Sequence, residues 1–152
     1  MIDRTKRDRL AQALRQLLSG QIDNLTFDDL ACPGNITNSD DLALFEIFYS
    51  VWPTYDDFKS HPMHLTDGQK LDFKRCVIFL HSDYEFEWPH KSAVINCLRR
   101  LLDEMTFRQF HSLRSQTTGD MSVWPFHRRE DYESALRAPR LLSGKRGERS
   151  AA

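Results

Sequence analysis

The sequence predicts a mainly α-helical protein, folded as a single compact helical domain of about five to seven helices. Apolar residues recur at helical spacing in several segments, and capping residues or prolines bound these segments. A hydrophobic content of 40%, with ten phenylalanines, is sufficient to form a core. The length of 152 residues is typical of one domain.

The first predicted helix spans residues 3–19, where four leucines share one face. Gly20 follows in the position where a glycine commonly ends a helix. Residues 21–38 hold only short apolar pieces and turn signals. Within them, Thr26 with Asp29 three residues later predicts the start of one short helical turn.

A second long helix is expected from Ser39, which is a favourable N-cap residue, to the Trp52-Pro53 step. The proline ends it, because the residue before a proline is pushed out of the helical region. A short helix capped by Thr54 is expected over residues 54–60. The stripe predicted to face the core of the longer helix consists of Leu42, Phe45, Tyr49 and Trp52, widened by Leu44, Phe48 and Val51.

Thr66 and Gln69 form a capping-box pattern and predict a helix that continues over residues 70–81. The stretch that follows alternates between acidic and aromatic residues, which allows a short extended segment near residues 82–88. In an extended segment the acidic residues would share one side and the aromatic residues the other. The two sets are Asp83, Glu85 and Glu87, and Tyr84, Phe86 and Trp88.

The clearest amphipathic pattern lies in residues 92–105 and predicts a further helix. Residues 123–126, Val-Trp-Pro-Phe, are expected to return the chain to the core, and residues 128–137 to form a last short helix. The helical domain therefore spans residues 1–137. Residues 138–152 have little to bury and are expected to be a mobile C-terminal tail.

Each of the three tryptophans is followed directly by proline, at positions 52, 88 and 124. The equal spacing is a feature of repeated units. The residues around the three steps do not otherwise align well. Two interpretations therefore stay open: a duplicated unit, or three separate helix ends whose indole rings fill the core.

The net charge of −1 gives no general electrostatic reason to bind nucleic acid, so nucleic acid is not an expected partner. The charge is unevenly distributed along the chain, however. Residues 21–67 carry nine acidic residues against one basic residue, Lys59, a local charge of −8. Both the N-terminal residues and the portion from Arg128 onward carry a charge of +3.

An acidic surface attracts basic molecules, so residues 21–67 predict a basic protein partner. The alternative is that the acidic residues cap helices or face the basic N-terminal helix of the same chain. The sequence does not predict the oligomeric state. The residues expected to contact the partner are Asp40, Asp41, Asp56 and Asp57.

A second candidate cluster lies in residues 81–90, where carboxylates and histidines gather beside a tryptophan. Such groups can act as acid and base or bind a metal ion, which leaves a small enzyme or metal-binding protein as the alternative function. No nucleophile motif, phosphate-binding loop or regular metal-ligand spacing accompanies them. We therefore assign no catalytic residue, metal ligand or cofactor. The cluster consists of His81, Asp83, Glu85, Glu87, Trp88 and His90.

The cellular location expected from the sequence is the cytoplasm. The three cysteines form no closely spaced pair, which favours reduced thiols over a disulfide framework. The N-terminal residues lack the apolar stretch of a signal peptide. No apolar run approaches the length of a membrane span, so no membrane partner is expected.

The segment from Arg75 to Pro89 resembles a motif of small uncharacterised bacterial proteins, in which an arginine opens an apolar run followed by Leu-x-Ser-Asp, an aromatic residue and Trp-Pro. Residues 123–126 and the charged stretch after them resemble the C-terminal portion of the same proteins. The resemblance covers about half of the chain and implies no activity or catalytic residues. Because small bacterial proteins of this sort include immunity proteins of toxin systems, it suggests an immunity-like protein by analogy.

Overall fold

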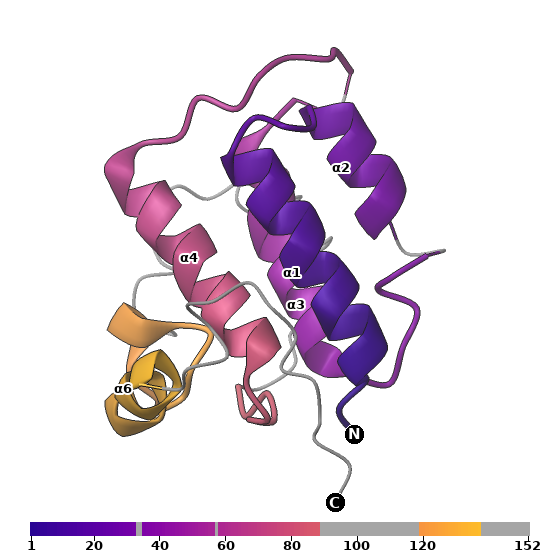
Figure 1. Cartoon of the computed structure of the whole chain (residues 1–152). Helices are drawn as coiled ribbons and strands as arrows, with labels where there is room; N and C mark the ends of the chain where they lie inside the picture. The colour runs from indigo at the N-terminus through magenta and orange to yellow at the C-terminus, as the bar shows by residue number, and fades with distance from the viewer. Residues whose placement is uncertain (33–34, 57, 89–118, 138–152) are drawn as a thin grey trace, which may run out of the picture.

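The computed structural model describes residues 1–32, 35–56, 58–88 and 119–137 (Figure 1). These residues form five α-helices and two short 3-10 helices, with no β-strand among them, which confirms the predicted helical class. The predicted helix over 92–105 and the predicted tail over 138–152 lie outside the described residues. The elements are α1 (Arg4–Leu18), α2 (Asn24–Ala31), α3 (Leu42–Val51), η1 (Trp52–Thr54), α4 (Asp67–His81), η3 (Met121–Val123) and α6 (Arg129–Arg137).

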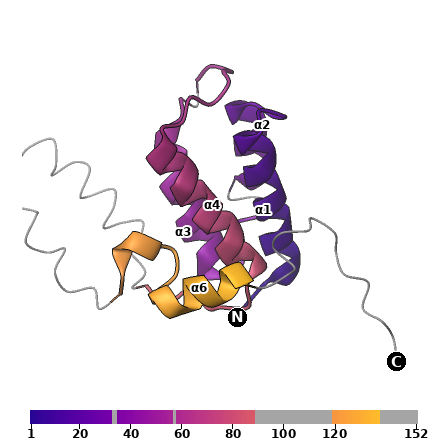
Figure 2. The same ribbon diagram turned by 60° about the vertical axis from the view of Figure 1, so that its left-hand side comes forward.

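Helix α1 occupies the centre of the fold, and α2, α3 and α4 all pack against it (Figure 1). Helix α3 also contacts α4, so these two helices and α1 enclose the core between them. Helix α6 lies across one end of α4 (Figure 2). No helix in the described ranges is long and apolar enough to cross a membrane.

The core follows from the helical spacing of apolar residues. Leu10, Leu14 and Leu17 of α1 are fully or almost fully buried, as their shared face predicts. Aromatic rings join the helices: Phe27 of α2 stacks on Phe48 of α3. The face of α3 differs from the prediction, because its centre is at Leu44, Ile47, Phe48 and Val51, which are buried. Leu42 is 42% exposed, and Phe45, Tyr49 and Trp52 are only partly buried.

Helix starts are corrected at two places. Asp41, not Ser39, caps α3: its carboxylate accepts the backbone N–H of Ala43. The hydroxyl of Ser39 instead donates a hydrogen bond to the carboxylate of Asp3. Asp23, not Thr26, caps α2, and the helix extends over eight residues rather than one turn. An aspartate caps as well as a serine or threonine does, so local propensity alone did not separate these candidates.

The prediction of a short helix over residues 54–60 is wrong for the residues described there. Helix α3 ends at Val51, before the Trp52-Pro53 step as predicted, and η1 continues the chain for one 3-10 turn. Tyr55 then takes an extended conformation, and the chain runs as an irregular loop to α4. Polar contacts with α2 hold this loop where a helix was expected, and these contacts join residues far apart in sequence.

The capping box before α4 is confirmed, with Thr66 and Gln69 bonded reciprocally. Residues 82–88 form an irregular segment without strand pairing. Its side chains nevertheless alternate as predicted: the three acidic residues are exposed, whereas Tyr84 and Phe86 pack on the core and Trp88 is buried. We call residues 82–88 the strap, because it crosses from the end of α4 toward the last described segment.

Trp88 anchors the end of the strap. Its indole N–H donates to the backbone oxygens of Pro125 and Phe126, at 3.0 and 3.2 Å. The Trp124-Pro125 peptide bond is cis. A Cβ added to Gly119 would lie 2.6 Å from the Trp88 ring, so no larger residue fits there. The Trp-Pro steps at 52 and 124 have different local structures, which favours separate helix ends over a duplicated unit.

An ion pair between Arg7 of α1 and Asp41 lies inside the protein. Arg7 has no exposed surface, and Asp41 is 3% exposed. Nε and Nη2 of Arg7 donate to the two carboxylate oxygens of Asp41, at 2.5 and 2.9 Å. Asp41 also accepts the backbone N–H groups of Asp3 and Ala43. This pair therefore fixes the start of α3 against the first turns of α1.

The same arginine holds the strap. Nη1 of Arg7 donates to the backbone oxygen of Tyr84 at 2.8 Å, and the guanidinium lies 5.2 Å from the ring centre of Phe79. Arg4, one turn earlier on α1, donates to the backbone oxygens of Leu80 and Ser82. Arg4 thus satisfies the Leu80 carbonyl, one of those that the end of α4 leaves unpaired, and both arginines bind backbone oxygens of the strap.

Replacing Arg7 by methionine should destabilise the protein by about 3–5 kcal/mol, because it leaves the Asp41 carboxylate buried without its partner. The free energy of unfolding in urea measures the effect. Arg9→Met is the matched control, since Arg9 is exposed on the same helix. A loss below about 1 kcal/mol for Arg7→Met would contradict a structural role for the pair.

Candidate functional site

The four aspartates predicted to contact a partner do not form one cluster. Asp40 and Asp41 precede α3, whereas Asp56 follows η1 beyond its other end. Helix α3 has ten residues and is therefore about 15 Å long. Asp57 lies outside the described residues. The predicted acidic surface thus divides into an N-terminal end around Asp40 and a second end beside α2.

Asp41 is removed from the set of contact residues, because Arg7 already neutralises it in the interior. Burial opposes the ionisation of this carboxyl, but the hydrogen bonds and charge of Arg7 outweigh that effect and hold its pKa below the usual range. The carboxylate is therefore ionised within the fold and structural in role. For Asp41, the alternative given above is therefore the correct one: this acidic residue caps a helix and pairs with the basic N-terminal helix of the same chain.

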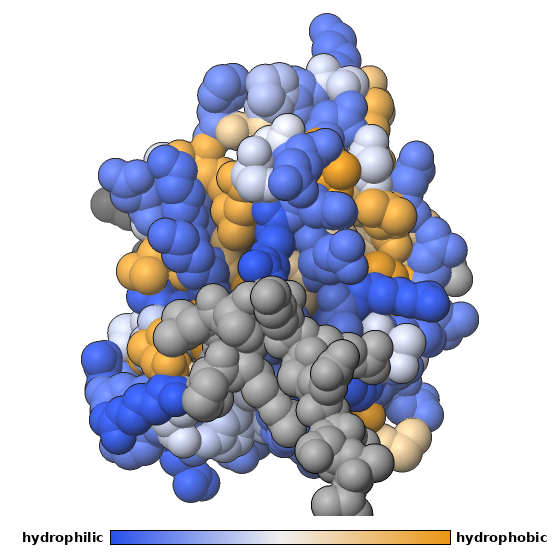
Figure 3. Space-filling view, viewed as in Figure 1, coloured by the Kyte–Doolittle hydropathy of each residue, from blue (hydrophilic) through white to orange (hydrophobic). Residues whose placement is uncertain are grey.

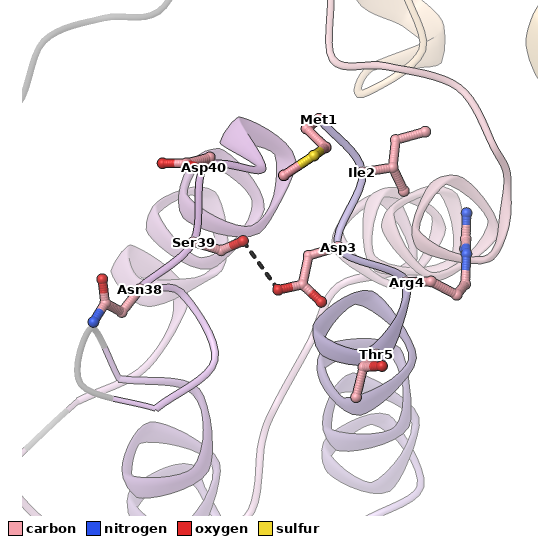
Figure 4. A pocket seen from close by; sticks show the side chains of 8 residues that line it. All are labelled: Met1, Ile2, Asp3, Arg4, Thr5, Asn38, Ser39 and Asp40. Carbon is pink, nitrogen blue, oxygen red and sulfur yellow. Dashed lines mark hydrogen bonds between the residues drawn. The ribbon is translucent and has the colours of Figure 1, made fainter.

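An open pocket of about 550 Å³ lies beside Asp40, between the chain start and the loop before α3 (Figure 4). Charges of both signs line it, because Asp3 and Asp40 are acidic and Arg4 is basic. Within it Ser39 donates to Asp3 at 3.2 Å. The lining therefore has no uniform charge to select an ionic ligand. The lining residues are Met1, Ile2, Asp3, Arg4, Thr5, Asn38, Ser39 and Asp40.

The other end of α3 carries a more uniform charge. Four carboxylates lie on α2, at its N-cap and on the loop beside it, and we call them the acidic α2 end: Asp23, Asp28, Asp29 and Asp56. Asp29 and Asp56 are exposed. Within the described ranges no lysine or arginine forms an ion pair with any of the four. Lys59 lies on the same loop but forms no ion pair with them, so this surface keeps a net negative charge.

Hydrogen bonds keep this end charged and in place. Those from Ser60 and Thr26 lower the pKa of Asp23 to about 2, so it is ionised at any physiological pH. Tyr55 donates its hydroxyl to Asp28 at 3.0 Å. These contacts connect α2 to the loop after η1. In the space-filling view, polar side chains cover much of the surface and apolar ones show between them (Figure 3).

Asn24, the first residue of α2, fixes the loop more firmly. It is fully buried, and its amide nitrogen donates to the backbone oxygens of Asp56 and Lys59. Its amide oxygen accepts the backbone N–H of His61 at 2.8 Å. One side chain therefore holds three points of the loop 56–61. Sequence reasoning missed this residue, because its partners are 32 to 37 residues away and no local pattern marks them.

The described members of the second candidate cluster lie at the last residue of α4, His81, and along the strap. Asp83 pairs with Arg4, and Glu85 lies 4.0 Å from the N-terminal amine. Glu87 is exposed and Trp88 is buried. Nδ1 of His81 lies 3.6 Å from a carboxylate oxygen of Asp8. His90 lies outside the described residues.

No group of three or more histidine, cysteine, aspartate or glutamate side chains in the described part of the chain could hold a metal ion together. The buried thiol of Cys76 is not a ready nucleophile, because burial raises its pKa. The motif that resembles small bacterial proteins has structural contacts: Leu80 is buried, Ser82 ends α4, Asp83 pairs with Arg4, and Trp88 bonds to Pro125.

Comparison of the chain with protein-family models, curated proteins and solved structures finds no match. Its function is therefore argued from its own residues.

Replacing Asn24 by alanine should release the loop 56–61 and lower the free energy of unfolding by about 2 kcal/mol, since three backbone groups lose their partner. Hydrogen exchange of the His61 amide should accelerate in the same variant. Leu30→Ala, a change at an exposed residue of the same helix, serves as the control. Unchanged exchange at His61 would show that Asn24 does not hold the loop.

Acid should destabilise the protein through His81. Burial lowers the pKa of this imidazole below its usual 6.5, and the nearby charges of Arg15 and Arg4 add to this, although Asp8 opposes it. The unfolded chain therefore takes up the proton more readily, so stability falls as the pH decreases below 6.5 through the lowered value. Urea unfolding at a series of pH values measures this slope. His81→Gln should flatten it, whereas His64→Gln, an exposed change, should not; equal slopes in both variants would refute the assignment.

Proposed function

We propose that the chain is a protein-interaction module that binds a basic protein partner through the acidic α2 end. The observation that carries this proposal is the contrast between the two ends of α3. At one end Arg7 neutralises Asp41 inside the fold. At the other, Asp29 and Asp56 are exposed and form no ion pair with a described residue. An uncompensated acidic surface attracts basic proteins and increases their rate of association.

Among the residues that the structure describes, no lysine or arginine of α1 forms an ion pair with this surface. Arg4 and Arg7 bind the end of α4, the strap and Asp41. Lys6 donates to the backbone oxygen of Asn38 and lies 3.8 Å from Asp3. All three cations therefore act near the start of α1, at the end of α3 opposite Asp56. Pairing with the basic N-terminal helix therefore explains Asp41 but does not explain the acidic α2 end.

The specific form of this function that we propose is an immunity-like protein, which would bind a basic toxin and block it. A small domain with one charged surface suits that task, because electrostatic attraction speeds capture of the partner. The alternative of a small enzyme at residues 81–90 finds less support. Asp83 is paired with Arg4 and Trp88 is buried in the core, so both side chains already have a role in the fold.

Reversing two charges at this end should weaken partner binding. The protein bound by the purified chain in extracts of its native cells is identified, purified and titrated by calorimetry. We expect Asp29→Lys with Asp56→Lys to raise the Kd at least about tenfold, because like charges then face each other. Asp40→Lys, an exposed aspartate at the opposite end of α3, is the matched control. Salt should weaken wild-type binding as well.

The proposal is wrong if the double charge reversal changes the Kd no more than Asp40→Lys does. It is equally wrong if the affinity of the wild-type chain is the same at low and high salt.

A further inference from the structure

Phe58 is the most exposed large apolar residue described in the structure, at 89%. It lies in the loop 56–61, between residues that are tied to α2. By contrast, Phe27, Phe79 and Phe126 belong to the core and are fully or almost fully buried. The core therefore does not use this ring, and folding gains nothing from it.

The backbone around Phe58 is nevertheless held in place. The N–H of Phe58 donates to the Asp56 carboxylate at 2.8 Å. The backbone oxygens of Asp56 and Lys59, on either side, accept from Asn24, and Ser60 donates to Asp23. A loop fixed in this way loses little conformational freedom when it binds, which favours affinity. The exposed ring is thus presented from a prepared position.

The surroundings of the ring determine the chemistry of the partner. Asp56 and Asp23 accept hydrogen bonds from the loop on either side of the ring, and Lys59 is the single cation described in that loop. An aromatic ring that stands out from a surface needs a concave apolar pocket to bury it. An acidic frame favours a pocket whose rim carries lysine or arginine. Large aromatic residues are frequent among the few that dominate binding energy at interfaces.

We propose that Phe58 is the anchor of the acidic α2 end, which inserts into an apolar pocket with a basic rim on a partner protein. The proposal rests on the function proposed above, because it takes the partner to be basic. It adds the residue that supplies most of the affinity and the shape of the surface that receives it. The carboxylates attract and orient the partner, and Phe58 determines how long it stays bound.

Photo-crosslinking in the native cells tests the contact. The full chain is made with p-benzoylphenylalanine in place of Phe58, and in a second version in place of Leu42. Leu42 is the matched control, since it is partly exposed at the opposite end of α3. We expect one protein adduct, formed from position 58 and not from position 42. Absence of an adduct at 58, an adduct of two copies of this chain, or an adduct with lipid alone would each overturn the proposal.

Binding to the purified crosslinked protein then measures the contribution of the ring. Phe58→Ala should raise the Kd at least about tenfold, mainly through faster dissociation, while Leu42→Ala changes it less than about twofold. The free energy of unfolding of Phe58→Ala should match the wild type, because the ring is exposed. A Kd of Phe58→Ala within about threefold of the wild type overturns the anchor.

The same titrations separate this proposal from the function on which it rests. If Asp29→Lys with Asp56→Lys weakens binding and Phe58→Ala does not, the acidic surface binds the partner and the anchor is wrong. If neither variant changes the Kd, both proposals fail.

Discussion

The buried pair of Arg7 and Asp41 is the interaction on which the arrangement of the other helices depends. Asp41 begins α3 and receives both the guanidinium and the backbone of Asp3. The same guanidinium holds the strap at Tyr84 and faces the ring of Phe79. A buried charge is costly unless every polar group around it is paired, and here the carboxylate and the strap together meet that condition. The pair thereby joins α1, α3 and α4 at one end of the core.

This use of charge also determines what remains on the surface. The cations near the start of α1 are engaged around α3 and α4. The acidic residues beyond the other end of α3 form no ion pair with a lysine or arginine in the described part of the chain. A local charge of −8 in residues 21–67 therefore has two origins. One part stabilises the fold, and the other part, at the acidic α2 end, is available to another molecule.

Much of the fold could be predicted from sequence, because helix starts, helix ends and apolar faces are local properties. The capping box at Thr66 and the helix end before Pro53 are examples. The buried roles of Arg7 and Asn24 could not be predicted, since their partners lie 32 or more residues away and nothing local distinguishes them from exposed residues. The separation of Asp40 from Asp56, by contrast, follows from the long helix that the sequence already predicts between them.

Buried polar side chains bind the backbone of both the strap and the loop 56–61, but the aromatic residue is buried in the strap and exposed in the loop. A buried arginine holds the strap through its backbone, and Trp88 lies in the core. A buried asparagine holds the loop 56–61 through its backbone, and Phe58 points away from the core. If holding the loop served the core alone, a polar residue at position 58 would satisfy the same hydrogen bonds without exposing a ring to water. The described fold does not use the exposed ring, and we therefore assign it to the binding of a partner, where aromatic residues contribute most.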